Sequence, residues 1–275
     1  MITEMGRIYP IKDKVKVQEL KLRFAAKNAN NRASGYEAAI KGNGKFEGFK
    51  RTDMDNLFVM EIEPTEASRA EFASRVVKPL KELAEKLGIL DKMVFTDEGD
   101  QAAHITAHVG KFTGTTTEEK EAALAWLKGN DSKILHSHLS EVGEILAGTH
   151  VTLDEVVCSG RDTYTGASQV NGDQGAIFRA RSVFDRAMKL AQVKLVKVNP
   201  NAKVGVHYPR YDDIVHVSSA RFTAKVDRQT MLAWIEGVNK LDAELKANPV
   251  RVEINKVNFL IATEGIEKRK PDLLK

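Results

Sequence analysis

Two short stretches of this sequence repeat one pattern, and that repetition limits the folds open to the chain more than any other feature. The stretches are AAHITAHV, which holds His104 and Thr106, and IVHVSSARF, which holds His216 and Ser218. In each, an imidazole and a hydroxyl lie two places apart in an apolar, β-prone segment. Side chains two places apart on a strand point to the same face, about 6.5–7 Å from each other. Each stretch therefore predicts a half-buried strand with one polar face.

The residues that alternate with these polar positions are apolar. Ile105, Val215 and Val217 face the other way and can pack beneath the sheet. If the two strands lie side by side, both imidazoles and both hydroxyls line one groove. We therefore expect the two motif strands to be neighbours.

Apolar periodicity and turn residues predict the other elements. Each half of the chain is predicted to hold a strand, a helix and a histidine-bearing strand. In order, we expect a strand at 57–62, a helix at 65–87 that Pro79 divides and Gly88 ends, a strand at 102–109, helices at 115–128 and 132–147, a strand at 150–160, a loop at 160–175, a short strand at 176–180, a helix at 182–198, a loop at 199–213, a strand at 214–222, a helix at 228–245 and a strand at 250–263. This order predicts an α+β fold with two pseudo-twofold lobes, built from mainly antiparallel sheets with flanking helices around a central cleft.

The same patterns divide the chain into a core and peripheral segments. Residues 1–55 form a predicted N-terminal extension, in which a basic segment with helical character precedes a stretch rich in glycine and charge. The two-lobed domain is expected to span 56–263, with a helical insertion at about 113–149, and a charged tail follows at 264–275. Both histidine motifs thus lie in the central domain.

Charge and cysteine content restrict the ligand class and the compartment. The net charge is only +4, which tolerates an anionic ligand but is far from the basic excess of a protein that coats nucleic acid. Cys158 is the single cysteine, which excludes an internal disulfide and fits a reducing compartment. The chain begins without an apolar signal-peptide core, and no stretch approaches the roughly 18 apolar residues of a membrane span. The sequence predicts a soluble, cytoplasmic protein that does not bind a membrane.

Two imidazoles and two hydroxyls in one groove suit the cleavage of phosphodiesters. A neutral imidazole can take a proton from an attacking hydroxyl or water, and an imidazolium opposite can protonate the leaving oxygen. The ordinary pKa of histidine, about 6.5, makes both protonation states accessible near neutral pH. Thr106 and Ser218 can donate hydrogen bonds to the nonbridging phosphate oxygens. The pattern therefore predicts His104 and His216 as catalytic residues, with no metal ion and no cofactor.

The paired motifs HIT and HVS resemble the doubled motif of the two-histidine phosphoesterase superfamily, which includes 2′,5′-RNA ligases and cyclic nucleotide phosphodiesterases. The stretches NLFVMEIEP and VNFLIAT resemble that family's first and final strands, so the resemblance covers about residues 56–263. Arg221 is similar in position to an arginine that often follows the family's second motif. The resemblance implies a metal-independent phosphodiesterase that acts on 2′,3′-cyclic or 2′,5′-linked RNA ends or small nucleotides, with ligation as the reverse reaction.

The chain departs from the family pattern at several points. Its two motifs are more widely spaced than is usual, and the helices predicted between them are the expected insertion. Ala107 and Ser219 replace a common leucine after the hydroxyl residue, and Val215 replaces a common proline before the second histidine. Strict alternation also puts Arg221 on the face opposite His216 unless a β-bulge intervenes. These departures leave the four proposed site residues intact.

Five further residues are candidate substrate contacts. His108 shares the polar face of the first motif if that strand stays regular, and Arg221 follows the second motif. Tyr208, Arg210 and Tyr211 lie in the segment that enters the second motif, where aromatic rings and a cation suit a nucleotide. Packing at a strand end or a surface turn accounts for these residues equally well.

Two other classes of function stay open. One is a protein that binds RNA or a nucleotide in the groove without efficient catalysis. The other is a metal-dependent hydrolase built on His136 and His138, although side chains two places apart on a helix diverge and cannot easily share an ion. Sensitivity to a chelator distinguishes the metal-dependent hydrolase from the metal-independent enzyme.

Overall fold

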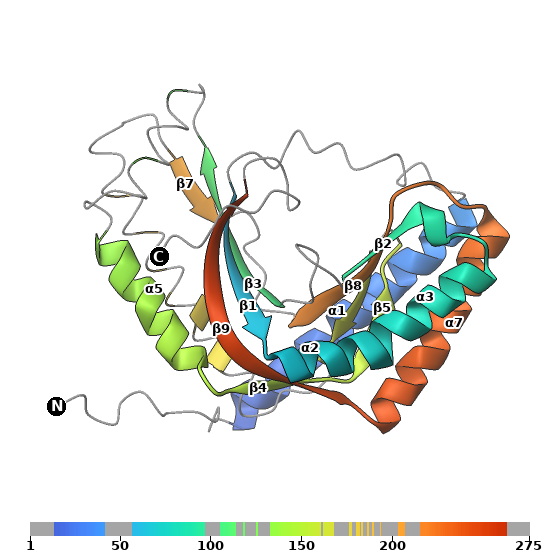
Figure 1. Cartoon of the computed structure of the whole chain (residues 1–275), viewed down its shortest axis with the longest axis horizontal. Coiled ribbons are helices and arrows are strands. Elements are labelled where there is room, and N and C mark those ends of the chain that lie inside the picture. Colours follow the sequence, from blue (N-terminus) through green and yellow to red (C-terminus); the bar gives the residue numbers. More distant parts are fainter. Residues whose placement is uncertain are drawn as a thin grey trace.

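The computed structural model describes residues 14–41, 57–96, 105–113, 133–160, 162–167, 203–206 and 215–262, together with single helical positions between 118 and 193. Within these residues, helices and antiparallel strands combine into an α+β fold (Figure 1). Among the described helices, none combines the length and the apolar character that a membrane-spanning segment needs.

The strands pair antiparallel wherever the structure describes a pair. They are β1 (Leu57–Pro64), β2 (Met93–Phe95), β3 (Ile105–Thr113), β4 (His150–Leu153), β5 (Glu155–Cys158), β6 (Asp162–Gly166), β7 (Lys203–Val206), β8 (His216–Phe222) and β9 (Val250–Ala262). The main path of pairing runs β4-β9-β1-β3-β8-β6-β5, while β2 joins β8 and β7 joins β3. The two motif strands, β3 and β8, are therefore adjacent near the middle of this path.

Helices cover the strands at two ends of the molecule. They are α1 (Lys14–Lys41), α2 (Glu66–Phe72), the π-helical turn η4 (Ala73–Val77), α3 (Lys78–Lys86), the short 3₁₀ turn η5 (Leu90–Lys92), α5 (Lys133–Leu146) and α7 (Arg228–Ala247). Helix α7 contacts β5, α1 and α3, whereas α2 and α5 both contact β9. Figure 1 shows α3 and α7 at the right-hand end, α2 below the strands in the middle, and α5 outside β9 on the left.

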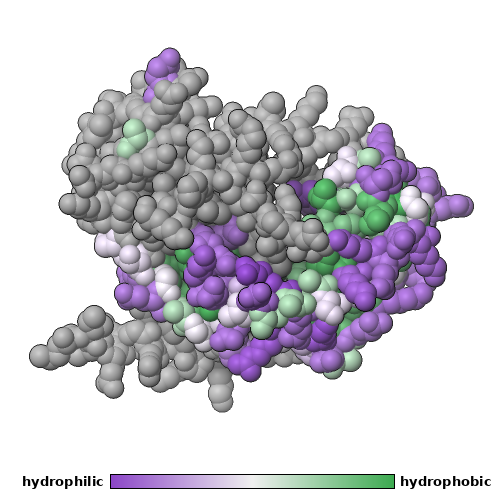
Figure 2. All heavy atoms as spheres, viewed as in Figure 1, coloured by the Kyte–Doolittle hydropathy of each residue, from purple (hydrophilic) through white to green (hydrophobic). Residues whose placement is uncertain are grey.

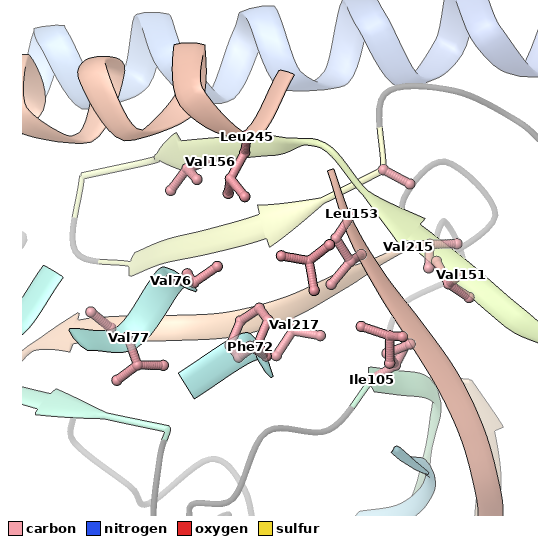
Figure 3. Packing of buried hydrophobic residues seen from close by; sticks show 14 of the residues in the cluster. Phe72, Val76, Val77, Ile105, Val151, Leu153, Val156, Val215, Val217 and Leu245 are labelled. Carbon is pink, nitrogen blue, oxygen red and sulfur yellow. The ribbon is translucent and has the colours of Figure 1, made fainter. Parts of the chain in front are cut away.

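One large apolar cluster fills the space between the strands and the helices. Ile105 of β3 and Val217 of β8 are almost fully buried in it, and Figure 3 shows Val217 beside Phe72 of α2. Trp234 of α7 is also fully buried, with its ring centroid 5.7 Å from that of Phe222 on β8. The motif strands thus present their apolar face to this core.

The predicted helix at 65–87 is confirmed, with an irregular turn inside it. Thr65 starts the helix because its side chain accepts a hydrogen bond from the backbone N–H of Ser68. Pro79 has no N–H to donate and its ring crowds the preceding turn, which accounts for the wider π-helical turn η4 just before α3. Gly88, at φ 65°, ends the helix in the left-handed conformation that favours glycine.

Several other predicted elements are confirmed. The strands expected at 57–62, 214–222 and 250–263 are β1, β8 and β9. The helices expected at 132–147 and 228–245 are α5 and α7. For the helices expected at 115–128 and 182–198, the structure describes single positions, each of them helical.

Local predictions between 150 and 213 were partly wrong. The expected loop at 160–175 contains β6, and the expected loop at 199–213 contains β7. The single strand expected at 150–160 is divided at Asp154 into β4 and β5. The described positions of the short strand expected at 176–180 are helical instead.

The hydroxyl groups of β6 explain why a segment that looks like a polar loop forms a strand. The sequence DTYTG suggested a polar loop, yet Thr163 and Thr165 are fully buried. The Thr163 hydroxyl accepts a hydrogen bond from Trp234 Nε1 at 3.1 Å, and the Thr165 hydroxyl lies 2.7 Å from that of Ser219. Because these polar groups find partners inside the fold, a segment that looks polar can be a central strand.

Helix α1 belongs to the segment predicted as an N-terminal extension, and it is closely attached to the rest of the fold. It contacts α7 and β5, and its Asn28 side chain is buried. Gly35 lies so close to β5 that an added Cβ would clash with the carbonyl oxygen of Cys158. The domain boundary at 55 stays a prediction, but α1 is not peripheral in its contacts.

Gly35→Ala is expected to lower the free energy of unfolding by about 1–3 kcal/mol, because helix and strand must move apart to admit the methyl group. Gly143→Ala in α5 is the matched control, since an added Cβ there meets nothing within 4 Å. The control should raise the free energy of unfolding by about 0.5–1 kcal/mol through helix propensity. Urea unfolding followed by circular dichroism measures both, and equal stabilisation by both variants would contradict the close approach of α1 to β5.

Candidate functional site

The first described residue of β3 pairs with the middle of the second motif. Ile105 lies opposite Val217, and both side chains enter the core. Residues directly opposite each other in neighbouring strands share a face of the sheet. The predicted pairing of the two motif strands is therefore confirmed at this position. The other face of β8, together with the same face of β6, is called the site face below.

His216 and Ser218 lie on the site face, and both are half-buried. Gly166 of β6 lies opposite His216 and carries no side chain to fill the space beside the imidazole. The ring of Tyr164 occupies this side instead, edge-on to the imidazole with centroids 5.2 Å apart and planes at 65°. Because Nδ1 of His216 is buried, the exposed surface of this residue lies on its other atoms.

A β-bulge at Ser219 changes the direction of the residues that follow the motif. On β6, Tyr164 pairs with Ser218 and the preceding residue, Thr163, pairs with Ala220, so Ser219 is the extra residue of β8. Thr96 supports the bulge: its hydroxyl donates a hydrogen bond to the Ser218 carbonyl at 2.5 Å. The bulge adds one residue to the alternation of the strand.

The bulge places Arg221 on the site face. Along β8, His216, Ser218 and Arg221 are half-buried while the intervening residues are buried. Strict alternation would have put Arg221 on the core face, and the extra residue reverses this. Arg221 Nε donates to Asp162 Oδ1 of β6 at 2.5 Å, and the two residues are cross-strand partners. The arginine is thus fixed in direction on the same face as the motif histidine.

Apolar surface continues beyond Arg221 onto β2. Val94 is the strand partner of Arg221 and is 45% exposed, and Leu90 of η5 is also exposed. Figure 2 shows apolar surface at the end of the molecule where β2 lies. A cation and an apolar surface therefore adjoin each other at this end of β8.

The structure describes only some of the remaining predicted site residues. His104, Tyr208, Arg210 and Tyr211 lie outside the described residues. The backbones of Thr106 and His108 belong to β3, where they pair with Glu61 and Met60 of β1. The described part of the candidate site therefore consists of His216, Ser218 and Arg221 with their neighbours.

His136 and His138, the alternative metal ligands, belong to α5 as predicted. Positions two apart on a helix are about 200° apart around its axis. Within the described ranges, no three His, Cys, Asp or Glu side chains are grouped closely enough to hold a metal ion. Among the described residues there is thus no group of side chains that forms a metal centre as an alternative to the histidine motif.

Sequence reasoning missed Tyr164, Asp162 and Thr96 as neighbours of the site. The first two come from β6, which was predicted as a loop, and Thr96 directly follows the unpredicted strand β2. The alternation of threonine and tyrosine in DTYTG was the available signal, because both residue types favour strands. Which residues of this strand would lie beside His216 was not visible without the pairing of β6 with β8.

Comparison with protein families, with curated proteins and with solved structures finds no match for this chain. The function is therefore inferred from the residues and their geometry.

Proposed function

We propose that this chain is a metal-independent phosphodiesterase that acts on 2′,3′-cyclic or 2′,5′-linked RNA ends or small nucleotides, and that ligation is its reverse reaction. The observation that carries the proposal is the pairing of the two motif strands through Ile105 and Val217. Ile105 is the middle residue of the first motif and Val217 the middle residue of the second. A pair at the two centres favours one shared site over two separate polar surfaces.

The proposed reaction divides proton transfer between two imidazoles. A water oxygen attacks phosphorus while one neutral imidazole takes its proton, and the other, protonated, imidazole donates a proton to the ribose oxygen that leaves. Because Nδ1 of His216 is buried, Nε2 is the nitrogen that would meet the substrate. The proposal requires His104, which directly precedes Ile105 in the sequence, to reach the same face.

The hydroxyls and Arg221 would bind the phosphate group. Ser218, on the site face beside His216, would donate a hydrogen bond to a nonbridging oxygen, with Thr106 in the equivalent role from the first motif. Arg221 carries a permanent positive charge, and its contact with Asp162 fixes the direction in which the guanidinium extends. The exposed Val94 beside it offers apolar surface to a base.

The finer architecture is part of the same proposal. The path of pairing places β9, β1 and β3 on one side and β8, β6 and β5 on the other, which supports two pseudo-twofold lobes with the motif strands at the centre of a cleft. We assign the protein to the cytoplasm, which agrees with the buried free thiol of Cys158. An RNA end or a small nucleotide is the proposed partner.

A substrate screen tests the proposed function. The purified full chain should hydrolyse 2′,3′-cyclic nucleotides or 2′,5′-linked dinucleotides in the presence of EDTA, while 3′,5′-linked dinucleotides serve as the comparison. Activity that EDTA abolishes and a divalent metal restores would favour the metal-dependent hydrolase. Binding without turnover would favour the nucleotide-binding protein. Either result contradicts the proposal.

Ser218→Ala is expected to lower kcat about tenfold or more, the scale of one hydrogen bond to a charged group. Thr106→Val should have a similar effect. Thr165→Val is the matched control, because it removes a hydroxyl from the core face of the neighbouring strand. The control should cost about 1 kcal/mol of stability and leave kcat unchanged. Full activity in both Ser218→Ala and Thr106→Val would remove these hydroxyls from the mechanism.

A further inference from the structure

Helix α1 contacts the site through one tyrosine hydroxyl. Asn31 Nδ2 donates a hydrogen bond to the Tyr164 hydroxyl oxygen at 2.7 Å, and this hydroxyl donates to Asn28 Oδ1 at 2.9 Å. The phenol thus both accepts and donates to side chains one turn apart on the same helix. Burial raises the pKa of Tyr164 to about 12, so the hydroxyl keeps its proton near neutral pH and remains a donor.

A buried cluster of charges fixes α1 in this position. Asn28 also donates to the carboxylate of Glu155 on β5. Arg32 Nη2 lies 2.9 Å from Asp242 Oδ1 of α7, and this carboxylate also accepts from the backbone N–H of Val156 at 2.8 Å. Glu155 and Asp242 are both buried residues, and an unpaired charge in such a place would be costly. These contacts therefore fix the position of α1 relative to β5 and α7.

The ring of Tyr164 contacts the motif histidine, His216. Tyr164 is 6% exposed, and its strand partner is Ser218. Its ring lies edge-on to the His216 imidazole, the arrangement that aromatic pairs prefer. Val157 of β5 packs with Tyr164 on this face, apart from the main core. A continuous set of contacts therefore leads from α1 through Tyr164 to His216.

We propose that Tyr164 is a positioning residue for His216, and that α1 holds Tyr164 in place through Asn28 and Asn31. The inference depends on the proposed function for its effect on turnover, but not for the geometry. The torsion between Cβ and an imidazole has broad energy wells, so packing must set the direction of the ring nitrogens. Proton transfer needs the donor and acceptor within about 2.6–3.2 Å. Contact with Tyr164 on one side would hold the His216 ring in the direction that proton transfer needs.

The test combines proton NMR of the His216 ring with kinetics of the full chain. Tyr164→Leu removes the aromatic ring. Tyr164→Phe keeps the ring and removes both of its hydrogen bonds to α1, whereas Asn31→Ala keeps the ring and removes one of them. The His216 resonance is assigned from its loss in His216→Gln. Tyr36→Phe is the matched control, because the Tyr36 hydroxyl joins α1 to Asn239 of α7 at 3.0 Å.

We expect Tyr164→Leu and Asn31→Ala to shift or broaden the His216 Hε1 resonance, and to lower kcat about tenfold with KM unchanged, the scale of a small misplacement of a catalytic group. Tyr36→Phe should change neither quantity. Tyr164→Phe should resemble Asn31→Ala, and because it keeps the buried ring it remains informative if Tyr164→Leu does not fold.

The outcomes separate this inference from the proposed function. An unchanged His216 resonance in folded Tyr164→Leu, or in both Asn31→Ala and Tyr164→Phe, overturns the positioning role whatever the substrate screen finds. An equal change in Tyr36→Phe also overturns it, because general docking of α1 would then be responsible. A shifted resonance in a protein that turns over no phosphodiester supports the positioning of His216 and rejects the proposed function alone.

Discussion

His216→Ala should lower turnover of a 2′,3′-cyclic or 2′,5′-linked substrate by roughly a hundredfold or more, the usual scale of a lost general acid or base. His104→Ala should cause a loss of similar size. The two losses should combine less than additively, because either one disables the same concerted step. Steady-state kinetics of the two single variants and the double variant measure these effects. His150→Ala on β4, where the imidazole pairs with Arg251, is the control and should keep full activity.

The pH profile adds a second requirement for the pair of histidines. One imidazole must begin neutral and the other protonated, so turnover should follow a bell-shaped curve bounded by the apparent pKa values of the pair. A substrate with a much better leaving group should rescue the variant that lacks the acid and not the variant that lacks the base. Rescue of neither variant, with stability unchanged, would contradict the division of roles.

Trp234→Ala should lower the free energy of unfolding by about 3–5 kcal/mol, the usual cost of truncating a buried tryptophan. The side chain is fully buried and packs edge-on against Phe222 of β8. It also donates a hydrogen bond to Thr163 of β6. The variant therefore leaves a cavity beneath both strands that carry the site face. Urea unfolding followed by circular dichroism measures the loss.

Two further variants separate the contributions of Trp234. Trp234→Phe keeps most of the packing and removes the Nε1 hydrogen bond, so its cost should be about 1–3 kcal/mol. Leu90→Ala truncates a side chain that is 44% exposed and should change stability by no more than about 0.5 kcal/mol. A small cost for Trp234→Ala, close to that of Leu90→Ala, would contradict the described core.

Local patterns in the sequence were sufficient to predict the strand that carries the second motif and the helix that follows the first strand. Alternation of polar and apolar residues predicted the strand of His216 and Ser218, with Val217 facing the core. Pro79 and Gly88 predicted the division and the end of one helix. These features depend on neighbours within a few residues of the chain, where backbone geometry alone sets which side chains share a face.

Only the tertiary structure decided which residues surround His216. The bulge at Ser219 depends on hydrogen bonds from Thr96 and on the register of β6, and it moved Arg221 to the site face against strict alternation. Tyr164 came from a predicted loop, and its partners Asn28 and Asn31 came from a predicted extension. The hydrogen bonds of Thr96, Asn28 and Asn31 join segments more than a hundred positions apart. The sequence by itself therefore determined the motif strands, while long-range pairing and burial determined their surroundings.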